Sequence, residues 1–375
     1  MINWIELNPD NLRQNFRIFS QVVGPDKLVI VLKSNAYGHG LAQVYEILKK
    51  ESPQWIAVNY VEEGAELRAL GFQGRIMVVG PFLPEQMTEA SRQKLELFLG
   101  HKEGLSAWLA AASKPDVHIE FDTGMSRQGF RPEDAAHVAE KLTAHKTQVR
   151  GICMHFSNVE DVTEHEYAKL QMQRFLSART EFIVRNFKLM AHAASSASAL
   201  ILDESRFDLN RVGISLYGFW PSQATKISYK QLHGQLVDIK PALAWRTKIT
   251  SINNVAQGQY IGYGCTYRAG HDMRVAVLPV GYFEGYPRMA SGSQAYVLIK
   301  GNRCPIVGRI CMNMMMVDIT HAPQSIEVGD IVTLIGQDLS EFIGASDVAA
   351  WAQTIHYELL SRIHPAIERR VISVK

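Results

Sequence analysis

Lys33 follows directly after an apolar run, and its amine is the first reactive group whose setting suggests chemistry. The run from Leu28 to Leu32 has the length and the β-branched content of a strand buried on both faces. A lysine at the end of such a strand is usually solvated or ion-paired, but its amine can also bond covalently to a carbonyl cofactor. The loop expected from Ser34 to His39 supplies the Tyr37 hydroxyl and a flexible turn, which could anchor a phosphate-bearing cofactor beside the lysine. A dinucleotide site is not indicated, because the third glycine of its fingerprint is missing.

Further polar side chains stand where other apolar runs end. The carboxyl ends of parallel strands collect catalytic residues, so these side chains are expected at one mouth of a barrel or sheet. Taken singly, His155 also fits a core histidine and Arg211 a structural ion-pair partner. The spacing of His155, Asp161 and His165 is not a zinc pattern, so no metal is expected. The set consists of Lys33, the Asp122–Arg127 segment, His155, His192 with Ser195 and Ser196, and Arg211.

The elements that would position these residues follow from the alternation of strand and helix patterns in the first part of the chain. Short apolar, strand-like runs end near residues 32, 59, 79, 99, 120, 155, 192 and 216. Helical patterns with apolar residues three and four apart lie between them, among them residues 62–70, 105–113, 132–142 and 164–184. So many βα units in so short a stretch favour a (β/α)8 barrel over a doubly wound sheet. We therefore predict a TIM-like barrel over residues 1–238.

The pattern changes beyond residue 238. Short segments rich in Val and Ile, separated by Gly and Asn turns, replace the alternation, and one helical pattern from about residue 345 to residue 362 interrupts them. At 375 residues the chain is long enough for two domains. The predicted fold class is α/β, with a (β/α)8 TIM-like barrel followed by a mostly β C-terminal domain over residues 239–375.

Charge and hydropathy exclude several classes of partner. The formal net charge is only +2 and no basic run is present, so nucleic acid is not an expected partner. The opening MINWIELNPDNLRQN has no apolar signal core, and no apolar stretch approaches the ~20 residues that span a bilayer. A cytoplasmic protein without membrane partners is expected. The four cysteines have neither metal-site spacing nor the density of a disulfide scaffold.

Motifs along nearly the whole chain resemble, in their order, those of the alanine racemases. That family uses pyridoxal 5′-phosphate (PLP) on a barrel plus β-domain scaffold, which agrees with the architecture predicted from the apolar pattern. The motifs are VLKSNAYGHG (31–40), FDTGMSRQGF (121–130), MHFSNVED (154–161), HAASSAS (192–198), FDLNRVGISLYG (207–218), GYGCTY (262–267), GYFEGYPR (281–288) and VGRICMNMMMVD (307–318).

The resemblance implies a catalytic or cofactor-binding role for each matching position. Lys33 matches the lysine that holds PLP covalently and moves the Cα proton on one face, and Tyr263 matches the base on the opposite face. Two bases on opposite faces are what inversion requires, and a phenol needs electrostatic help to act as one at neutral pH. Arg211 matches the arginine at the pyridine nitrogen, and His155 belongs to the same network. The matches around the phosphate are Tyr37, Ser196, Gly213, Ile214 and Tyr357.

The resemblance also implies a substrate site shared between two subunits. Arg127 matches the arginine at the cofactor's phenolic oxygen and the substrate carboxylate, with the Met312 backbone amide as a second donor. In this family Tyr263 and Met312 reach into the partner's barrel, so a homodimer with shared active sites is implied. Where many members carry a carbamylated lysine that orients the arginine, this chain has Glu120. We hypothesise that the Glu120 carboxylate supplies the same negative charge permanently.

Departures from the family pattern leave the substrate partly open. Asn313 replaces a frequent aspartate, Glu284 replaces the usual aspartate of GYxDGY, and Ser195 stands where asparagine is common. Besides PLP-dependent racemisation of L-alanine and D-alanine, a racemase of serine, lysine or several amino acids is therefore the nearest alternative. The bulky Tyr263, Tyr282 and Tyr357 favour a small side chain. A PLP-dependent decarboxylase and a non-catalytic PLP-binding protein are more remote, because the GYGCTY and CMN motifs and the separate β domain would be unexplained.

The biological role of the activity is also open at this point. An alanine racemase is an isomerase that can supply D-alanine for peptidoglycan precursors or serve the breakdown of L-alanine. The sequence does not distinguish the two.

Overall fold

The computed structural model describes residues 2–373, which fall into two compact units. One unit consists of residues 11–34 and 44–240, and the other of residues 2–10, 35–43 and 241–373. Within residues 2–373, no helix combines the length and the apolar character that crossing a membrane requires.

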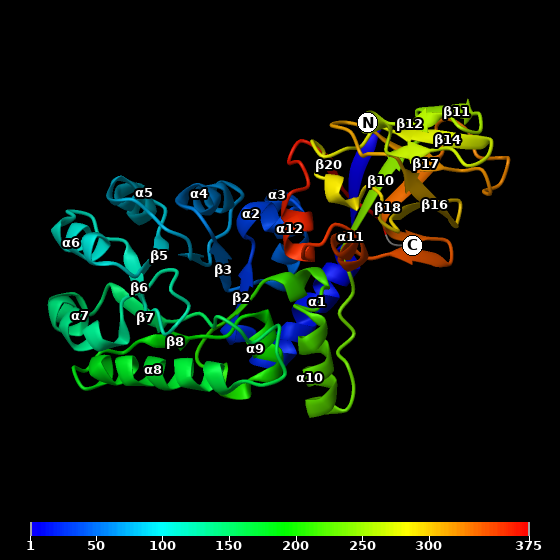
Figure 1. Cartoon of the computed structure of the whole chain (residues 1–375). Helices are drawn as coiled ribbons and strands as arrows, with labels where there is room; N and C mark the ends of the chain where they lie inside the picture. Colours follow the sequence, from blue (N-terminus) through cyan, green and yellow to red (C-terminus); the bar gives the residue numbers. More distant parts are fainter. Residues whose placement is uncertain (1, 374–375) are drawn as a thin grey trace. The chain divides into compact units, whose positions relative to one another are not determined.

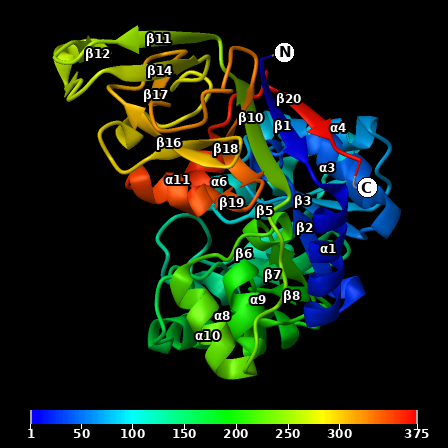
Figure 2. The ribbon, with the colours of Figure 1, turned by 90° about the vertical axis from the view of Figure 1, so that its right-hand side faces the viewer.

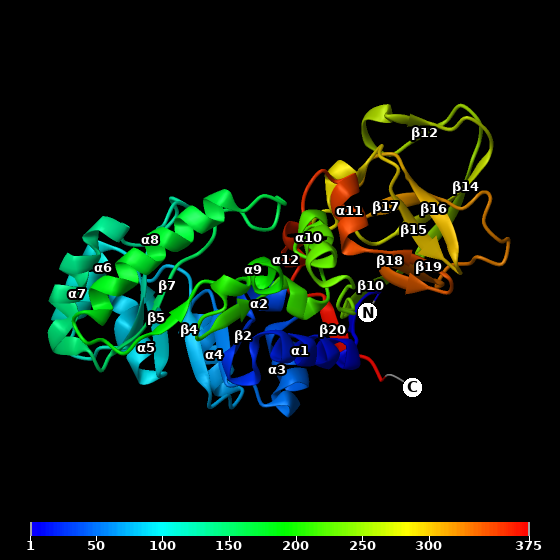
Figure 3. The ribbon, with the colours of Figure 1, turned by 90° about the horizontal axis from the view of Figure 1, so that it is seen from below.

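The first unit is an eight-stranded parallel barrel with helices around the outside of its strands (Figures 1 and 3). Seven of the eight predicted strands lie close to their predicted positions, and the eighth is displaced. The strands are β2 (Leu28–Val31), β3 (Trp55–Val58), β4 (Arg75–Val78), β5 (Leu95–Leu99), β6 (Asp116–Glu120), β7 (Val149–Cys153), β8 (Met190–His192) and β9 (Asn210–Val212). The helices are α1 (Pro9–Val23), α3 (Leu41–Leu48), α4 (Val61–Ala69), α5 (Met87–Arg92), α6 (Lys102–Ala110), α7 (Ala135–Leu142), α8 (Glu166–Ile183), α9 (Ser196–Ile201) and α10 (Gln223–His233).

The barrel is nearly closed. The strand order is β8-β7-β6-β5-β4-β3-β2-β9, so β8 and β9 are the two ends of the ladder. Backbone N–H groups of Asp208, Leu209 and Arg211 donate to the carbonyl oxygens of Ala191 and Ala194 and join these ends. The run from residue 28 to residue 32 is buried throughout, as its composition predicted.

The last barrel strand is shorter and earlier than predicted. The expected strand ended near Leu216, but β9 ends at Val212 and Ile214–Tyr217 forms a 3-10 turn, η7. Gly213, with φ −105° and ψ −97°, separates the two. The turn is fully buried, and the Tyr217 hydroxyl donates to the Val31 carbonyl oxygen at 2.8 Å. Periodicity cannot distinguish a short buried strand from a buried turn, which explains the error.

The segment after Lys33 is a left-handed helical turn, α2 (Lys33–Tyr37), where a loop was expected. Its residues 34–37 all have φ between 52° and 57°. Left-handed helical geometry costs L-residues roughly 1–2 kcal/mol each, so neighbouring contacts must hold it. Two such contacts use the Asn35 carbonyl oxygen, which accepts from Gly40 N at 2.9 Å, and the Asn35 side chain, which accepts from Leu41 N at 2.9 Å.

The second unit is mostly β, as predicted, but it includes the first strand of the chain (Figure 2). β1 (Asn3–Leu7) pairs antiparallel with β10 (Leu243–Lys248) and parallel with β20 (Glu368–Val371), so a division after residue 238 does not describe this strand. The large sheet has the order β11-β14-β17-β16-β15-β18-β10-β1-β20. Its other strands are β11 (Ser251–Val255), β14 (Met273–Leu278), β15 (Tyr296–Ile299), β16 (Asn302–Val307), β17 (Met315–Asp318) and β18 (Ile331–Asp338), with β19 (Glu341–Ile343) paired to β18.

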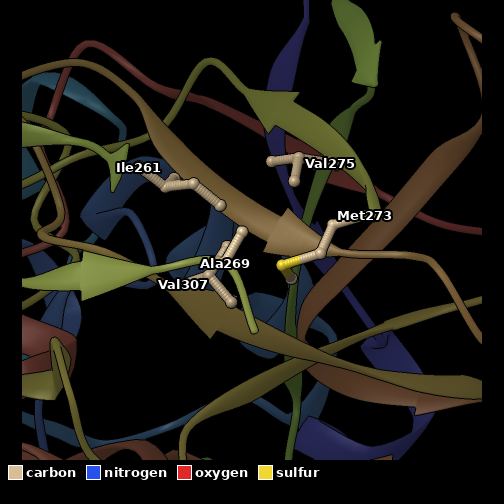
Figure 4. Close-up of a cluster of buried hydrophobic side chains, with 5 residues drawn as sticks. All are labelled: Ile261, Ala269, Met273, Val275 and Val307. Atoms are coloured by element: carbon tan, nitrogen blue, oxygen red, sulfur yellow. The ribbon is translucent and has the colours of Figure 1, made fainter. Parts of the chain in front are cut away.

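A small hydrophobic core supports the part of this unit that carries Tyr263. The hairpin of β12 (Tyr260–Ile261) and β13 (Tyr267–Arg268) encloses the short turn η8 (Tyr263–Cys265). Ile261 and Ala269 pack with residues of the large sheet beneath the hairpin. Figure 4 shows this cluster, formed by Ile261, Ala269, Met273, Val275 and Val307. The hairpin is therefore anchored at its base while η8 stays exposed.

The C-terminal helical pattern is interrupted. One helix was expected from about residue 345 to residue 362, but α11 (Ala345–Trp351) and α12 (His356–Ser361) are separate. Gln353 between them has φ 55°, which ends α11. The backbone of α12 packs closely on Gly38, because a Cβ at Gly38 would lie 1.9 Å from the Leu360 carbonyl oxygen.

Gly38 and Gly71 provide a matched pair for testing this packing. Both have positive φ, but a Cβ at Gly71 would meet nothing within 4 Å. We expect Gly71→Ala to lower the free energy of unfolding by about 1 kcal/mol, from backbone strain alone. Gly38→Ala should cost clearly more, because the Leu360 carbonyl must also move. Urea denaturation of the two variants measures the difference, and equal losses would contradict the close packing.

Candidate active site

Lys33 lies at the carboxyl end of the barrel strand β2, where its amine is held among charged groups. Burial lowers the pKa of Lys33, and the nearby guanidinium groups of Arg127 and Arg211 lower it further, against an opposing effect of Glu63. Glu63 is fixed by accepting from the backbone N–H groups of Ser34 at 2.6 Å and Asn59 at 2.7 Å. A lysine with a lowered pKa offers more neutral amine, which is the nucleophilic form.

Arg211 on β9 is buried, and both of its terminal nitrogens, Nη1 and Nη2, donate hydrogen bonds inside the barrel. Nη1 donates to His192 Nδ1 at 2.5 Å and to the His192 carbonyl oxygen at 3.2 Å. Nη2 donates to the Met154 carbonyl oxygen at 2.8 Å, and lies 3.3 Å from the Ala193 carbonyl oxygen and 3.4 Å from His155 Nδ1. The Nε–H group donates no hydrogen bond to any residue of the range 2–373.

His155 follows β7 and faces this guanidinium. Burial lowers the pKa of His155 well below its usual value, and the charges of Arg211, Arg127 and Lys33 lower it further. The imidazole is therefore neutral near pH 7, and its Nδ1 accepts from Arg211. The structure places His155 in the network that the resemblance implied.

The loop that carries Arg127 is shaped by Asp122. One carboxylate oxygen of Asp122 accepts from the backbone N–H groups of Gly124, Met125 and Ser126 at 2.9–3.0 Å. Burial acts to raise the pKa of Asp122, but these three bonds and the charge of Arg131 outweigh it and lower the pKa. The carboxylate thus stays charged and fixes the turn that presents Arg127.

Glu120 ends β6 beside this loop. Burial raises the pKa of Glu120 to about 7, although Gln128, Arg211 and Arg127 act in the opposite direction. Its Oε2 accepts from Gln128 Nε2 at 2.6 Å, and Gln128 also donates to the Val79 carbonyl oxygen at 3.1 Å. The hypothesis of a permanent negative charge is therefore not supported near and below neutral pH.

Ser196, Gly213 and Ile214 form a compact turn next to Arg211. Ser196 begins α9, and its Oγ accepts from the backbone N–H of Gly213 at 2.9 Å and of Ser215 at 3.5 Å. Ile214 begins η7, so backbone N–H groups converge here. Converging N–H groups with a hydroxyl are a donor set suited to phosphate.

The remaining predicted residues lie in the second unit. The rings of Tyr37 and Tyr357 lie with their centroids 6.3 Å apart. Tyr37 is followed by Gly38, whose carbonyl oxygen accepts from Arg369 Nη2 at 3.0 Å. Tyr263 on η8 is 70% exposed and Met312 is 55% exposed, which leaves both side chains free of the core of their own unit.

The barrel thus gathers six of the predicted residues around one mouth. They are Lys33, Glu120, Arg127, His155, Ser196 and Arg211. Sequence reasoning missed Gln128, which bridges two elements, and the polar pair Glu96 and His118 inside the barrel. Their one sequence signal is a charged or imidazole residue in the middle of an otherwise apolar strand, as in LELFL and VHI.

These residues fit PLP on three counts. The amine with a lowered pKa suits covalent attachment, and the unengaged Nε–H of buried Arg211 suits an unprotonated ring nitrogen. The Ser196 hydroxyl, beside the buried backbone turn at Gly213 and Ile214, suits the phosphate. Among residues 2–373, no group of three His, Cys, Asp or Glu side chains is placed to hold a metal ion.

Comparisons with known proteins agree with this site. The family model of the alanine racemase N-terminal domain matches residues 7–221, and that of the alanine racemase C-terminal domain matches residues 242–371. An alanine racemase of Leptospira interrogans is 37% identical over 99% of this chain and 96% of its own length. An alanine racemase of Halothermothrix orenii is 34% identical over 98% of this chain and 96% of its own length.

Solved structures give the same result. The alanine racemase of Bacillus anthracis with bound L-Ala-P superposes with a TM-score of 0.90 at 29% identity, over 99% of this chain and 95% of that one. The biosynthetic alanine racemase of Pseudomonas aeruginosa superposes with a TM-score of 0.85 at 30% identity, over 99% of both chains. The chain therefore belongs to the alanine racemase family of PLP-dependent amino-acid isomerases.

Proposed function

We propose that this protein interconverts L-alanine and D-alanine with PLP, using Lys33 on one face of the substrate and Tyr263 of a second subunit on the other. The observation that carries the proposal is the setting of Lys33: an amine with a lowered pKa stands among Arg127, His155 and Arg211 at the barrel mouth. The relatives with a matching barrel and β domain are named alanine racemases.

The residues of the barrel hold the cofactor in this proposal. The backbone of Gly213 and Ile214 and the Ser196 hydroxyl bind the phosphate, with the hydroxyls of Tyr37 and Tyr357 as further donors. Arg211 would offer its Nε–H to the ring nitrogen, and because a guanidinium stays protonated, that nitrogen would stay unprotonated. Bound PLP supplies a covalent link to the substrate amine and an electron sink for the Cα carbanion.

Lys33 and Tyr263 move the Cα proton. The neutral Lys33 amine takes the proton from one enantiomer on its own face, and the Tyr263 hydroxyl returns one on the opposite face; the roles exchange in the reverse direction. Neutral His155 beside Arg211 is the proposed partner that adjusts the basicity of the tyrosine. Two bases on opposite faces give inversion without release of the substrate carboxylate.

The substrate carboxylate is the group that Arg127 and the Met312 backbone amide bind in this proposal. An arginine matches a carboxylate in geometry and charge. Glu120 acts on Arg127 through its charge when it is ionised, and Gln128 holds the Glu120 carboxyl in place.

A homodimer with shared sites is proposed from the surface of the β unit. Tyr263, Tyr282, Phe283, Met312 and Met314 are all exposed, between 44% and 70%. The Phe283 and Met312 segments are adjacent, since Phe283 N donates to the Met312 carbonyl oxygen at 2.9 Å. Exposed apolar side chains gathered in this way are typical of a protein interface. We further propose a cytoplasmic enzyme that supplies D-alanine for peptidoglycan precursors.

A broader substrate range is the second candidate, because two departures from the family pattern contact one another. Asn313 Nδ2 donates to Glu284 Oε1 at 2.8 Å, and Glu284 Oε2 accepts from Gly281 N at 2.8 Å. The amide of Asn313 removes one negative charge from the surroundings of Met312. Serine or lysine racemisation alongside that of alanine is the expected sign of such a change.

The proposed activity is tested by chiral chromatography of L-alanine, D-alanine, L-serine and L-lysine after incubation with PLP-loaded protein. We expect both alanine enantiomers to approach an equal mixture, and Lys33→Ala to abolish this and the absorption of covalently held PLP. Inversion of serine or lysine with unchanged alanine would show that the protein is a racemase of those amino acids instead. No inversion of any amino acid would contradict the proposal.

The shared site is tested by mixing two inactive variants. Lys33→Ala and Tyr263→Phe, mixed in equal amounts after reversible dissociation, should regain about one quarter of the wild-type activity, because half of the dimers are hybrids with one intact site. Sites confined to one subunit would regain none. Each variant incubated alone serves as the control.

The charge state of Glu120 gives a pH dependence of stability. Its pKa is raised to about 7 in the folded protein, so the folded state binds a proton that the unfolded state has already released above the ordinary value of 4.5. The free energy of unfolding should therefore fall as pH rises from 4.5 to about 7. Urea denaturation of PLP-free protein at several pH values measures this fall. Glu120→Gln should abolish the contribution of Glu120 to the fall, whereas Glu133→Gln, at an exposed position, should leave the fall unchanged.

The same variant tests the effect of Glu120 on substrate binding. Without the carboxylate behind Arg127, KM for alanine at pH values above 7 should rise roughly ten-fold, equivalent to about 1.4 kcal/mol. Steady-state kinetics of Glu120→Gln measures this rise. An unchanged KM would show that Glu120 does not act on the substrate arginine.

A further inference from the structure

A continuous chain of hydrogen bonds runs inside the barrel from Arg211 to Arg75. Arg211 Nη1 is 2.5 Å from His192 Nδ1, and His192 Nε2 is 2.8 Å from His118 Nδ1. His118 Nε2 is 2.8 Å from Glu96 Oε2, and the two oxygens of Glu96 accept from Arg75 Nε at 2.5 Å and Nη2 at 2.7 Å. The chain links residues of β9, β8, β6, β5 and β4.

The two ends of the chain fix the direction of every hydrogen bond in it. A guanidinium only donates, so His192 Nδ1 must accept and carries no proton. The proton of neutral His192 is then on Nε2 and is donated to His118 Nδ1, which must also be bare. His118 therefore carries its proton on Nε2 and donates it to Glu96, which as a carboxylate only accepts. A charged His118 is excluded, because it would leave His192 without either ring proton.

The pKa directions agree with a neutral His192 and an ionised Glu96. Burial lowers the pKa of His192 well below its usual value, and the Arg211 charge lowers it further, so His192 is neutral. Burial works to raise the pKa of Glu96, but the hydrogen bonds from His118 and Arg75 outweigh it and lower the pKa. Glu96 is thus an ionised carboxylate with its side chain only 6% exposed.

Gly151 makes room for the pair of imidazoles. It lies on β7, between the strands of His118 and His192, and pairs with His118 and Met190 in the ladder. A Cβ at Gly151 would lie 2.1 Å from His118 Nδ1, the atom that accepts from His192. No residue with a side chain could stand here without displacing the contact.

Aromatic side chains enclose the same chain. The Trp55 and His118 rings meet edge to face at 6.3 Å, and the Phe98 ring lies 5.8 Å from His118 and 5.4 Å from His192. The Arg75 guanidinium lies over Trp55 at 4.0 Å, with its side chain 38% exposed. The interior part of this hydrogen-bond chain is therefore shielded from water, and only its Arg75 end reaches solvent.

We propose that Glu96 is a positioning residue for the reaction: through His118 and His192 it fixes the orientation of the Arg211 guanidinium and so aims the Nε–H group at the cofactor. This rests on the proposed function for the role of Arg211 at the ring nitrogen. Glu96 touches neither substrate nor cofactor. Its effect reaches the site only through two neutral imidazoles whose tautomers it determines.

The tautomers can be measured directly in the PLP-loaded full chain. Two-bond proton–nitrogen correlation spectra of protein labelled with ¹⁵N in histidine should show His118 and His192 as neutral rings with the proton on Nε2, assigned by the loss of signals in His118→Gln and His192→Gln. A proton on Nδ1 of either ring, or a charged ring, would overturn the proposal. This measurement is independent of whether the protein racemises alanine.

Glu96→Gln tests the effect on the site. It should alter the absorption spectrum of bound PLP and lower kcat about ten-fold with little change in KM, since outer hydrogen-bond partners of site groups act on this scale. The matched control is Asp116→Asn, which removes another arginine–carboxylate pair at the same end of the barrel, Arg150 Nε to Asp116 Oδ2 at 2.7 Å, without touching the chain. An unchanged spectrum and kcat in folded Glu96→Gln would overturn the proposal.

Gly151→Ala provides a second variant should Glu96→Gln fail to fold. Its methyl group displaces the His118 ring, so the cofactor spectrum should change as in Glu96→Gln, and a wild-type spectrum would contradict the proposal. If the wild-type protein racemises no amino acid, the proposed function fails, while the tautomers and the cofactor spectra still decide the role of Glu96.

Discussion

A guanidinium buried inside a barrel needs hydrogen-bond acceptors for its N–H groups, and the position of Arg211 depends on the acceptors that the barrel provides. Main-chain carbonyl oxygens at Met154, His192 and Ala193 take some of them, and neutral imidazoles take others. What remains is one donor, Nε–H, and a positive charge that lowers the pKa of His155 and of Lys33. The nucleophilic character of the lysine thus depends partly on a charge that the barrel interior keeps in place.

Much of the barrel and its mouth could be predicted from local sequence. The buried run before Lys33 defines β2, and its end places the amine at the carboxyl edge, where parallel strands collect reactive groups. Arg127 and His155 were also expected near that edge from their positions after strand-like runs, whereas Arg211 lies within β9, just before the run that was predicted as the last strand. Such predictions succeed because strand burial and strand ends are properties of neighbouring residues.

Features that depend on distant residues were not predictable. Glu96 lies in a strand with an otherwise apolar sequence. Nothing local reveals that His118, two residues along the neighbouring strand β6 from the partner of Glu96, donates a hydrogen bond to it. The left-handed turn after Lys33 has no glycine at residues 34–37, so its φ values contradict local preference and are held by contacts with Glu63 and within the turn. The misplaced strand at Leu216 and the first strand of the β unit likewise reflect partners far along the chain.

The pairing of β1 with β10 and β20 has a consequence for how the chain folds as it is synthesised. Residues 3–7 are synthesised long before their neighbours in the sheet, which are residues 243–247 and 368–371. The Gly38 carbonyl oxygen likewise gains its hydrogen bond from Arg369 only after that residue has been made. Strands β2 to β8, each of which pairs with the next strand along the chain, can assemble while the nascent chain grows. Strand β9 must return to β2, and the segment after Lys33 reaches its final surroundings only after residue 369 has been made.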